Sequence, residues 1–364
     1  MSWTESFPVM GEDMVDDYEN LATPEEKAEL EEWYGVKEIF NAQDKRHLVS
    51  FSLFWKPSSA SKKVYPTPTR EILQTAGELG LDLRFEPWPH YIQPVLDAMP
   101  VLMEKYDDVT VRVYLAADLD FLVEDFVNVG CEVYLMRHPS LAHAPGVVWR
   151  VLAFAEKDRL VTMVDSDRLN EVIADIERTR EMDRAGLKSW RVPVMIDTDG
   201  AGKVVYKSFI GCQIGAEGGW PMERLLHAFT WHSRRGSLPT LVDVPGCGVM
   251  PINHGYWPDF GFEEWFLTVV MYPRMAGAGM LTFVPTGASS SLLLLDIEYA
   301  TWANPNSQLV IFPTESCCGP VRSKLAGYPA DDVVEFPKSD DYDSEKNGRA
   351  MLPPRVGENL SSES

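Results

Sequence analysis

The chain has 364 residues and a hydrophobic fraction of 45%, enough for one large α/β domain or two smaller ones with a sizeable core. Its net charge of −22 argues against nucleic acid as a partner, because phosphate backbones bind basic surfaces. The longest apolar runs, such as residues 292–295, are far too short to span a bilayer, so we expect no transmembrane segment.

The cysteines and the N-terminal sequence bear on the cellular compartment. No N-terminal segment combines basic residues with an apolar run, which predicts that there is no signal peptide. The cysteines are odd in number, include an adjacent pair and fit no zinc spacing, so a reducing compartment is the simplest interpretation. They are Cys131, Cys212, Cys247, Cys317 and Cys318. We therefore expect a cytoplasmic protein.

The first predicted unit is an acidic N-terminal helical arm over residues 1–45. Its first 44 residues carry 13 acidic and 2 basic side chains, a net of −11, which is half of the total charge. Thr23 can cap a helix that has Pro24 at its first position, and Glu26 completes a capping box. Such a segment can be a solvated arm or a partner-docking element, and the charge favours the solvated arm.

Strands and helices alternate in the second predicted unit, residues 46–185. Apolar, β-prone runs predict strands, and apolar residues at helical spacing predict helices. The predicted strands are residues 47–55, 81–86, 109–115, 131–136 and 160–164, and the predicted helices are residues 69–79, 91–106, 118–129, 146–156 and 168–182. This alternation predicts an α/β fold with a mainly parallel central sheet flanked by helices.

The third predicted unit, residues 186–337, is more irregular. Strands are predicted at residues 192–196, 204–210 and 309–312, helices at 220–233 and 262–272, and a long loop at 237–259. Pro273 is expected to mark the end of the last helix. Past Pro337 the composition turns polar and charged, which predicts a disordered tail over residues 338–364.

The stretch Asp165-Ser166-Asp167 carries the strongest chemical signal. It follows the apolar run 160–164, which places it at the carboxyl end of a strand, where open parallel sheets bind ligands. Two carboxylates at this spacing can share one divalent cation, and Mg²⁺ or Mn²⁺ commonly combine carboxylates with substrate phosphates. The same pattern at residues 118–120 starts a predicted helix, and at residues 197–199 it is typical of a turn.

The order of motifs resembles that of GT-A glycosyltransferases, and more closely a group of bacterial and viral-type sugar transferases. In that group a Trp-Arg helix precedes the aspartate motif, and a glycine-bearing loop and an acidic helix follow it. The similar stretches are VWRVL at residues 148–152, VDSDR at 164–168, IGCQIG at 210–215 and GFEEWFL at 261–267. This chain differs in having Val164 where the group often has Arg, Arg168 where it often has Ser, and Glu263 or Glu264 where Asp is usual.

The resemblance implies a GT-A-like fold with two halves in one domain. Residues 46–185 would bind a nucleotide-sugar, and residues 186–337 would bind the acceptor. The implied function is a metal-dependent glycosyltransferase that moves a sugar from a nucleotide-diphosphate donor to a glycan or other hydroxyl acceptor. Asp165 and Asp167 would hold Mn²⁺ or Mg²⁺, which would stabilise charge on the departing diphosphate.

The resemblance also assigns donor-binding residues. They are Lys56, Arg150, Ser166, Gln213 and His254. Each of the charged ones has an ordinary alternative: Arg150 can be a surface arginine, Lys56 a solvated lysine, and His254 a plain loop residue. Tryptophans in the second half can stack on sugar rings or belong to the core. They are Trp220, Trp257 and Trp265.

The acceptor hydroxyl needs a base if the anomeric centre inverts. Glu263 and Glu264 lie at the start of a predicted helix, and neighbouring carboxylates can raise one pKa enough to make such a base. The alternative is an acidic pair that complements the helix dipole. Both interpretations stay open at this point.

Two other functions stay open. An aspartate-dependent phosphatase or phosphotransferase also places Asp-x-Asp after a strand, but near the start of its domain, and a phospho-aspartate at Asp165 would support it. A non-catalytic GT-A-like binding subunit would keep the fold without transferring a sugar. Metal-dependent nucleotide-sugar binding and donor hydrolysis discriminate the transferase from that subunit.

Overall fold

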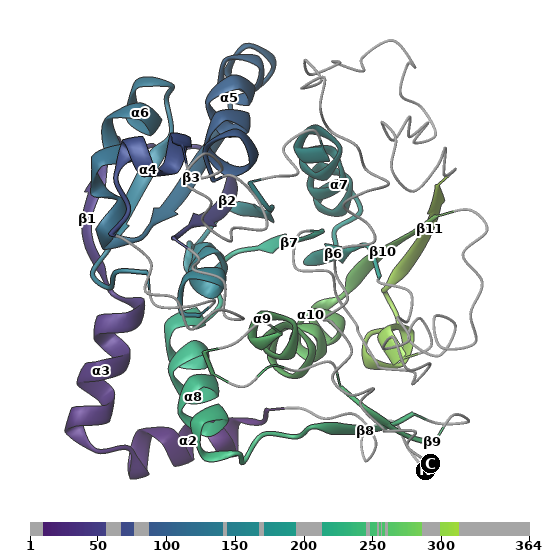
Figure 1. The fold of residues 1–364 in the computed structure, drawn as a ribbon. Coiled ribbons are helices and arrows are strands. Elements are labelled where there is room, and N and C mark those ends of the chain that lie inside the picture. The colour runs from purple at the N-terminus through teal and green to yellow at the C-terminus, as the bar shows by residue number, and fades with distance from the viewer. Residues whose placement is uncertain are drawn as a thin grey trace, which may run out of the picture.

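The computed structural model describes most of the chain up to residue 312 (Figure 1). The described residues are 10–55, 67–75, 87–140, 144–166, 171–193, 213–244, 248–252, 255, 257–258, 261–285 and 299–312. The predictions for Lys56, Asp167 and His254 lie outside them, as do the predicted strands 81–86 and 204–210 and the predicted tail. No helix in these segments has both the length and the apolar character needed to cross a membrane.

Nine strands within the described segments form one sheet, in the order β1-β4-β3-β2-β5-β7-β6-β10-β11. Their bounds are β1 Val36–Phe40, β2 His47–Leu53, β3 Val109–Leu115, β4 Glu132–Met136, β5 Leu160–Met163, β6 Ser189–Arg191, β7 Ile214–Glu217, β10 Met280–Pro285 and β11 Gln308–Phe312. Strands β2 to β5 pair in parallel, as do β6, β10 and β11. Strand β1 is antiparallel to β4, and β7 is antiparallel to both of its neighbours. The predicted α/β class with a mainly parallel sheet is confirmed.

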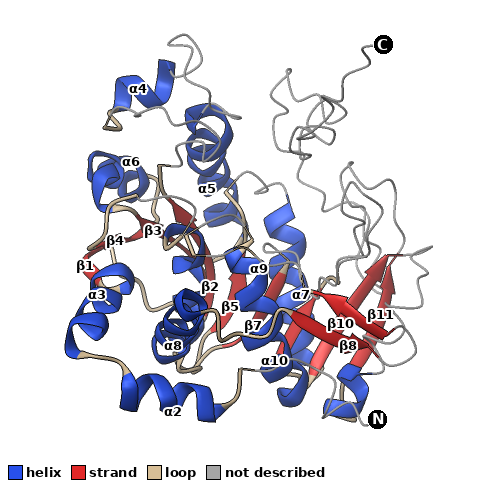
Figure 2. Cartoon of the chain, turned by 60° about the horizontal axis from the view of Figure 1, so that its bottom comes forward, coloured by secondary structure: helices blue, strands red, loops and turns tan. Residues whose placement is uncertain are grey.

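Helices cover both faces of the sheet (Figures 1 and 2). One face carries α5 (Gln93–Lys105), α6 (Val123–Asn128) and α7 (Val172–Arg184), and the other carries the 3₁₀ helix η3 (Gly146–Ala155), α8 (Met222–Arg235), α9 (Phe262–Phe266) and α10 (Tyr272–Ala278). Shorter segments are α4 (Arg70–Thr75), η1 (Trp88–Ile92), η2 (Ala117–Leu122) and η5 (Leu267–Met271).

Strand β2 shows how the two faces are separated. Successive side chains of a strand point to opposite faces. Phe51 meets the Phe126 ring of α6 edge-on, with ring centroids 6.5 Å apart. Ser50 and Ser52 instead hydrogen-bond the backbone of Arg150 on η3. All seven residues of β3 are buried, as expected for a central strand covered on both faces.

Several elements differ from the predictions. Strands β1, β7 and β10 were not predicted, and β6 ends before the predicted strand at residues 192–196, of which two residues are described. The predicted loop 237–259 contains the hairpin of β8 (Leu241–Val244) and β9 (Gly248–Pro251). The helix expected to end at Pro273 continues through η5 into α10. Pro273 lies in the first turn of α10, where a missing N–H is tolerated.

The capping box of the N-terminal segment is confirmed. Two helices form there, α2 (Glu12–Leu21) and α3 (Pro24–Tyr34). The Thr23 N–H donates to Glu26 Oε2 at 2.9 Å, and the Glu26 N–H donates to Thr23 Oγ1 at 3.3 Å. These two bonds satisfy donors that the start of α3 would otherwise leave exposed.

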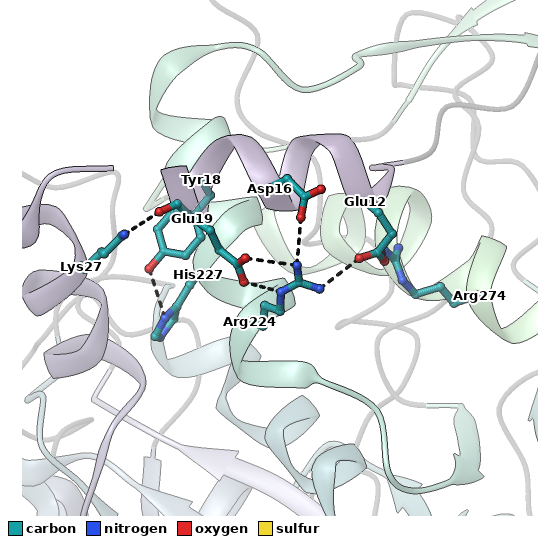
Figure 3. Close-up of polar contacts among 8 residues, drawn as sticks. All are labelled: Glu12, Asp16, Tyr18, Glu19, Lys27, Arg224, His227 and Arg274. Atoms are coloured by element: carbon teal, nitrogen blue, oxygen red, sulfur yellow. Dashed lines mark hydrogen bonds and ion pairs between the residues drawn. The ribbon is translucent and has the colours of Figure 1, made fainter. Parts of the chain in front are cut away.

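The acidic segment packs against α8, so the expectation of a solvated arm is corrected. Met10, Val15, Leu30 and Trp33 are buried in the main core. At the rim, Arg224 of α8 forms ion pairs with three acidic side chains of α2, as Figure 3 shows. The high charge of the segment favours a solvated arm, but apolar residues lie between its acidic ones and are buried. Burial of those apolar residues away from water stabilises the packed arrangement.

Candidate functional site

The site is built around Arg150, which η3 carries over the face of β2. The Arg150 N–H donates to Ser52 Oγ at 2.9 Å, and Ser50 Oγ donates to the Arg150 carbonyl at 2.8 Å. Arg150 is only 5% exposed. The alternative of a plain surface arginine is therefore wrong.

The Arg150 guanidinium joins two carboxylates that are far apart in the sequence. Its Nε and Nη2 donate to the two oxygens of Glu263 at 2.8 and 2.7 Å, a bidentate pair. Its Nη1 donates to the Val164 carbonyl at 2.8 Å and to Asp165 Oδ1. Four of its five N–H donors are thus used inside the protein, which fixes the plane of the guanidinium.

Asp165 emerges from the sheet directly after β5. The Val164 N–H donates to the Ser50 carbonyl at 3.0 Å, so the chain stays tied to β2 up to that point. The Asp165 side chain is 33% exposed, whereas Ser166 is buried. The first aspartate of the motif therefore stands at the carboxyl ends of two parallel strands, partly open to solvent.

Gln213 lies at the same edge of the sheet. It directly precedes β7, whose Ile214 is paired with Met163 of β5. Its side-chain Nε2 donates to Glu171 Oε2 at 3.0 Å, and its carbonyl accepts from the Val192 N–H at 3.1 Å. The structure thus brings Arg150, Asp165 and Gln213 to one edge.

Burial and charge act in opposite directions on this cluster. Burial alone would lower the pKa of Arg150, but Asp165 and Glu263 outweigh that effect and raise the pKa well above its ordinary value. Burial raises the pKa of the Glu263 carboxyl, and the charge and hydrogen bonds of Arg150 oppose this shift. One guanidinium thus hydrogen-bonds two carboxylates, of which Glu263 is the buried one and Asp165 the partly exposed one.

Asp165 is the described residue that could bind a divalent cation at this edge. Asp165 offers carboxylate oxygen at a partly open position, and oxygen is the ligand type that Mg²⁺ and Mn²⁺ prefer. The second predicted ligand, Asp167, lies outside the described residues.

Other predicted residues lie in less accessible places. Glu263 is 3% exposed and held by Arg150, while its neighbour Glu264 is half-buried. Trp265 is fully buried and donates to the Pro239 carbonyl at 2.9 Å, so it is a core residue and not a sugar platform. Trp257 stacks on Trp33 with ring centroids 4.4 Å apart.

Ser50 and Ser52 were missed by the sequence analysis. Both lie in the run HLVSFSLFW, two small polar residues at alternate positions of an otherwise apolar strand. A buried hydroxyl needs a hydrogen-bond partner, so this pattern could have predicted a polar group packed on that face of β2.

No protein-family model matches the sequence, and no curated protein matches it either.

Proposed function

We propose that this protein is a metal-dependent glycosyltransferase that moves a sugar from a nucleotide-diphosphate donor to a hydroxyl acceptor. The observation that carries the proposal is the Arg150 clamp. It holds Asp165 at the carboxyl ends of β2 and β5, within a mainly parallel sheet. Ligands of open α/β sheets bind at such ends.

Asp165, together with Asp167, would hold Mn²⁺ or Mg²⁺. The bound cation would act as a Lewis acid toward the diphosphate of the donor. Ser166, which follows Asp165 in the chain, and Gln213, which lies at the same edge of the sheet, keep their predicted donor-binding role. Lys56 and His254 keep their predicted donor-binding role as part of the same proposal. The acceptor is a glycan or another hydroxyl compound.

The geometry supports different roles for Arg150 and the two glutamates from those first expected. The Arg150 guanidinium donates hydrogen bonds to Glu263, Val164 and Asp165. We therefore assign Arg150 the role of a positioning residue for Asp165 rather than a diphosphate ligand. Glu263 in turn orients Arg150. We assign the role of acceptor base to Glu264, because it is the more accessible carboxylate of the pair.

A screen of nucleotide-sugars for Mn²⁺-dependent donor hydrolysis tests the proposal and identifies base and sugar together. We expect Asp165→Asn to lower turnover by about 100-fold or more, because a catalytic metal contributes several kcal/mol. Asp120→Asn is the matched control, since Asp120 is an exposed aspartate of another Asp-x-Asp stretch. Equal turnover of the Asp165 variant and the control contradicts the catalytic role of Asp165.

The same screen and one trapping experiment separate the alternatives. Metal-dependent nucleotide binding without hydrolysis or transfer to any acceptor would instead support a non-catalytic binding subunit. A phosphorylated Asp165, trapped with a phosphate-ester substrate and detected by mass spectrometry, would support a phosphatase or phosphotransferase.

A further inference from the structure

A second group of titratable side chains lies where α3 meets α8. One ring nitrogen of His227 and one carboxylate oxygen from each of Glu31 and Glu223 all lie within 4.8 Å of one another. Imidazole nitrogen and carboxylate oxygen together are a common ligand set for Zn²⁺ and related divalent ions. Acidic groups often gather on protein surfaces without a metal, so the two glutamates alone do not indicate a metal site. The argument for one depends on the histidine.

His227 has a buried nitrogen with no hydrogen-bond partner among the described residues. The side chain is 8% exposed, and its Nδ1 lies 3.4 Å from the Tyr18 hydroxyl (Figure 3). Its Nε2 is buried and makes no hydrogen bond there. Buried polar atoms nearly always have a partner, so this nitrogen points to a missing ligand.

The hydrogen bond to Tyr18 suits a metal-binding histidine. If Nδ1–H donates to the Tyr18 hydroxyl, the lone pair of Nε2 is left for a cation. Metal-bound histidines usually donate their other ring N–H in this way, which fixes the tautomer.

The surroundings leave negative charge uncompensated. Glu31 and Glu223 bring two exposed carboxylates to one place, each with an oxygen within 4.8 Å of the other and of a His227 ring nitrogen. Arg137 lies 3.4 Å from Glu31, but both side chains are nearly half exposed, so this ion pair is weak. A dication would neutralise both carboxylates at once.

We propose that Glu31, Glu223 and His227 form a binding site for a divalent transition metal ion, best represented by Zn²⁺. Bonds of about 2.0–2.2 Å allow two ligands to be at most about 4.4 Å apart, so small rotations of the exposed glutamates close the site. A surface cavity of about 440 Å³, lined by Tyr18, Glu223 and His227 among others, lies beside it. A fourth coordination position can thus take water or a small ligand. This site is separate from Asp165 and independent of the proposed transferase activity.

Calorimetry with ZnCl₂ on the full chain, purified without a histidine tag and treated with a chelator, tests the proposal. We expect the double variant Glu31→Gln/Glu223→Gln to bind Zn²⁺ at this site about 100-fold more weakly, because two of three protein ligands lose their charge. The variant Tyr18→Phe should bind about 10-fold more weakly, as is usual for partners of metal-bound histidines. Glu32→Gln is the matched control, an exposed glutamate of α3 outside the cluster.

Co²⁺ provides a second measurement that reports on the ligands. Its visible absorption should change when His227→Gln removes the nitrogen ligand, and Zn²⁺ should raise the melting temperature of the wild type but not of the double variant. The double variant changes only exposed side chains, so circular dichroism should show a folded protein. Equal Zn²⁺ affinity of the double variant and the control, or no Zn²⁺ binding by the wild type, overturns the proposal.

Discussion

At the scale of single residues, Arg150 connects parts of the chain that the sequence keeps far apart. Its two carboxylate partners lie 15 and 113 residues downstream. Breaking a buried ion pair by removing one partner is more costly than replacing both partners by apolar groups, because a single buried charge is left uncompensated. Asp165 and Glu263 thus share one guanidinium, and removing either carboxylate changes the surroundings of the other.

The first stability prediction concerns this pair. Glu263→Gln should lower the free energy of unfolding by about 3 kcal/mol, because Arg150 loses its bidentate carboxylate in a buried place. Urea denaturation measures the loss, with the exposed Glu38→Gln on β1 as the control. The double variant Arg150→Met/Glu263→Leu should lose less than the two single variants together. If the loss in the double variant equals the sum of the losses in the two single variants, Arg150 and Glu263 are not coupled.

The buried histidine His47 makes the free energy of unfolding depend on pH, with a definite sign. Burial, then Arg180 and Arg46, lower the pKa of His47 to about 3 from its ordinary 6.5, so folded His47 is neutral while unfolded His47 takes up a proton. Its contribution to stability is therefore complete above pH 6.5 and is lost as the pH falls toward 3.

The variant His47→Gln tests this sign, because the Gln amide can still bond Thr162 but does not titrate. Its free energy of unfolding, measured by urea denaturation between pH 7 and 4, should fall less steeply with acid than that of the wild type. Parallel curves for the two proteins would show that His47 does not contribute to the acid sensitivity.

At the scale of elements, the docking of the N-terminal helices has an apolar and an ionic part. Trp33 is buried and its carbonyl accepts from Trp149 Nε1 at 2.8 Å, while Arg224 and its acidic partners lie at the solvent-exposed rim. Exposed ion pairs contribute little and are screened by salt, whereas large buried side chains contribute several kcal/mol.

We therefore expect Trp33→Ala to cost about 3–5 kcal/mol at any salt concentration. Arg224→Gln should lower the melting temperature only slightly, and the difference should vanish in high salt. Thermal melts in low and high salt measure both variants. A large, salt-independent effect of Arg224→Gln would show that the ion pairs, and not the apolar contacts, hold α2 and α3 on α8.

The elements that sequence predicts well are those whose signal is local. Strands β2, β3, β4 and β5 follow continuous apolar runs, and they were found with small errors in their ends. Strand β7 was missed because its sequence, IGAE, is poor in β-branched residues. Tertiary packing demands Gly215 there, since a Cβ would lie 2.2 Å from Trp190 Nε1.

The candidate site likewise has one feature that a local sequence pattern predicts and others that depend on distant residues. The position of Asp165 at the end of a strand follows from the apolar run before it, so the sequence predicted it. The pairing of Arg150 with Glu263 joins residues 113 positions apart, and no local pattern marks it. The burial of Trp265 was equally hidden, because a tryptophan at a helix start suits a core and a binding surface alike.

At the scale of the whole molecule, the sheet joins both predicted halves, since β5 and β7 pair across them. The N-terminal helices close the outer side of α8, where Tyr34 Oη lies 2.7 Å from Thr230 Oγ1. Removing residues 1–34 should expose the apolar side of α8. We expect the shortened chain to bind a hydrophobic dye and to aggregate on size-exclusion chromatography. A monodisperse, dye-free product would show that these helices are dispensable.

The distance along the chain between α2 and its partner helix also has a consequence for biosynthesis. Glu12 and Arg224 are 212 residues apart. At about 5–20 residues per second, α2 leaves the ribosome about 10–40 s before the helix it packs against. During that interval its acidic side chains keep an apolar segment in solution without a docking partner. The high charge of the segment thus favours the solubility of the nascent chain before α2 docks on α8.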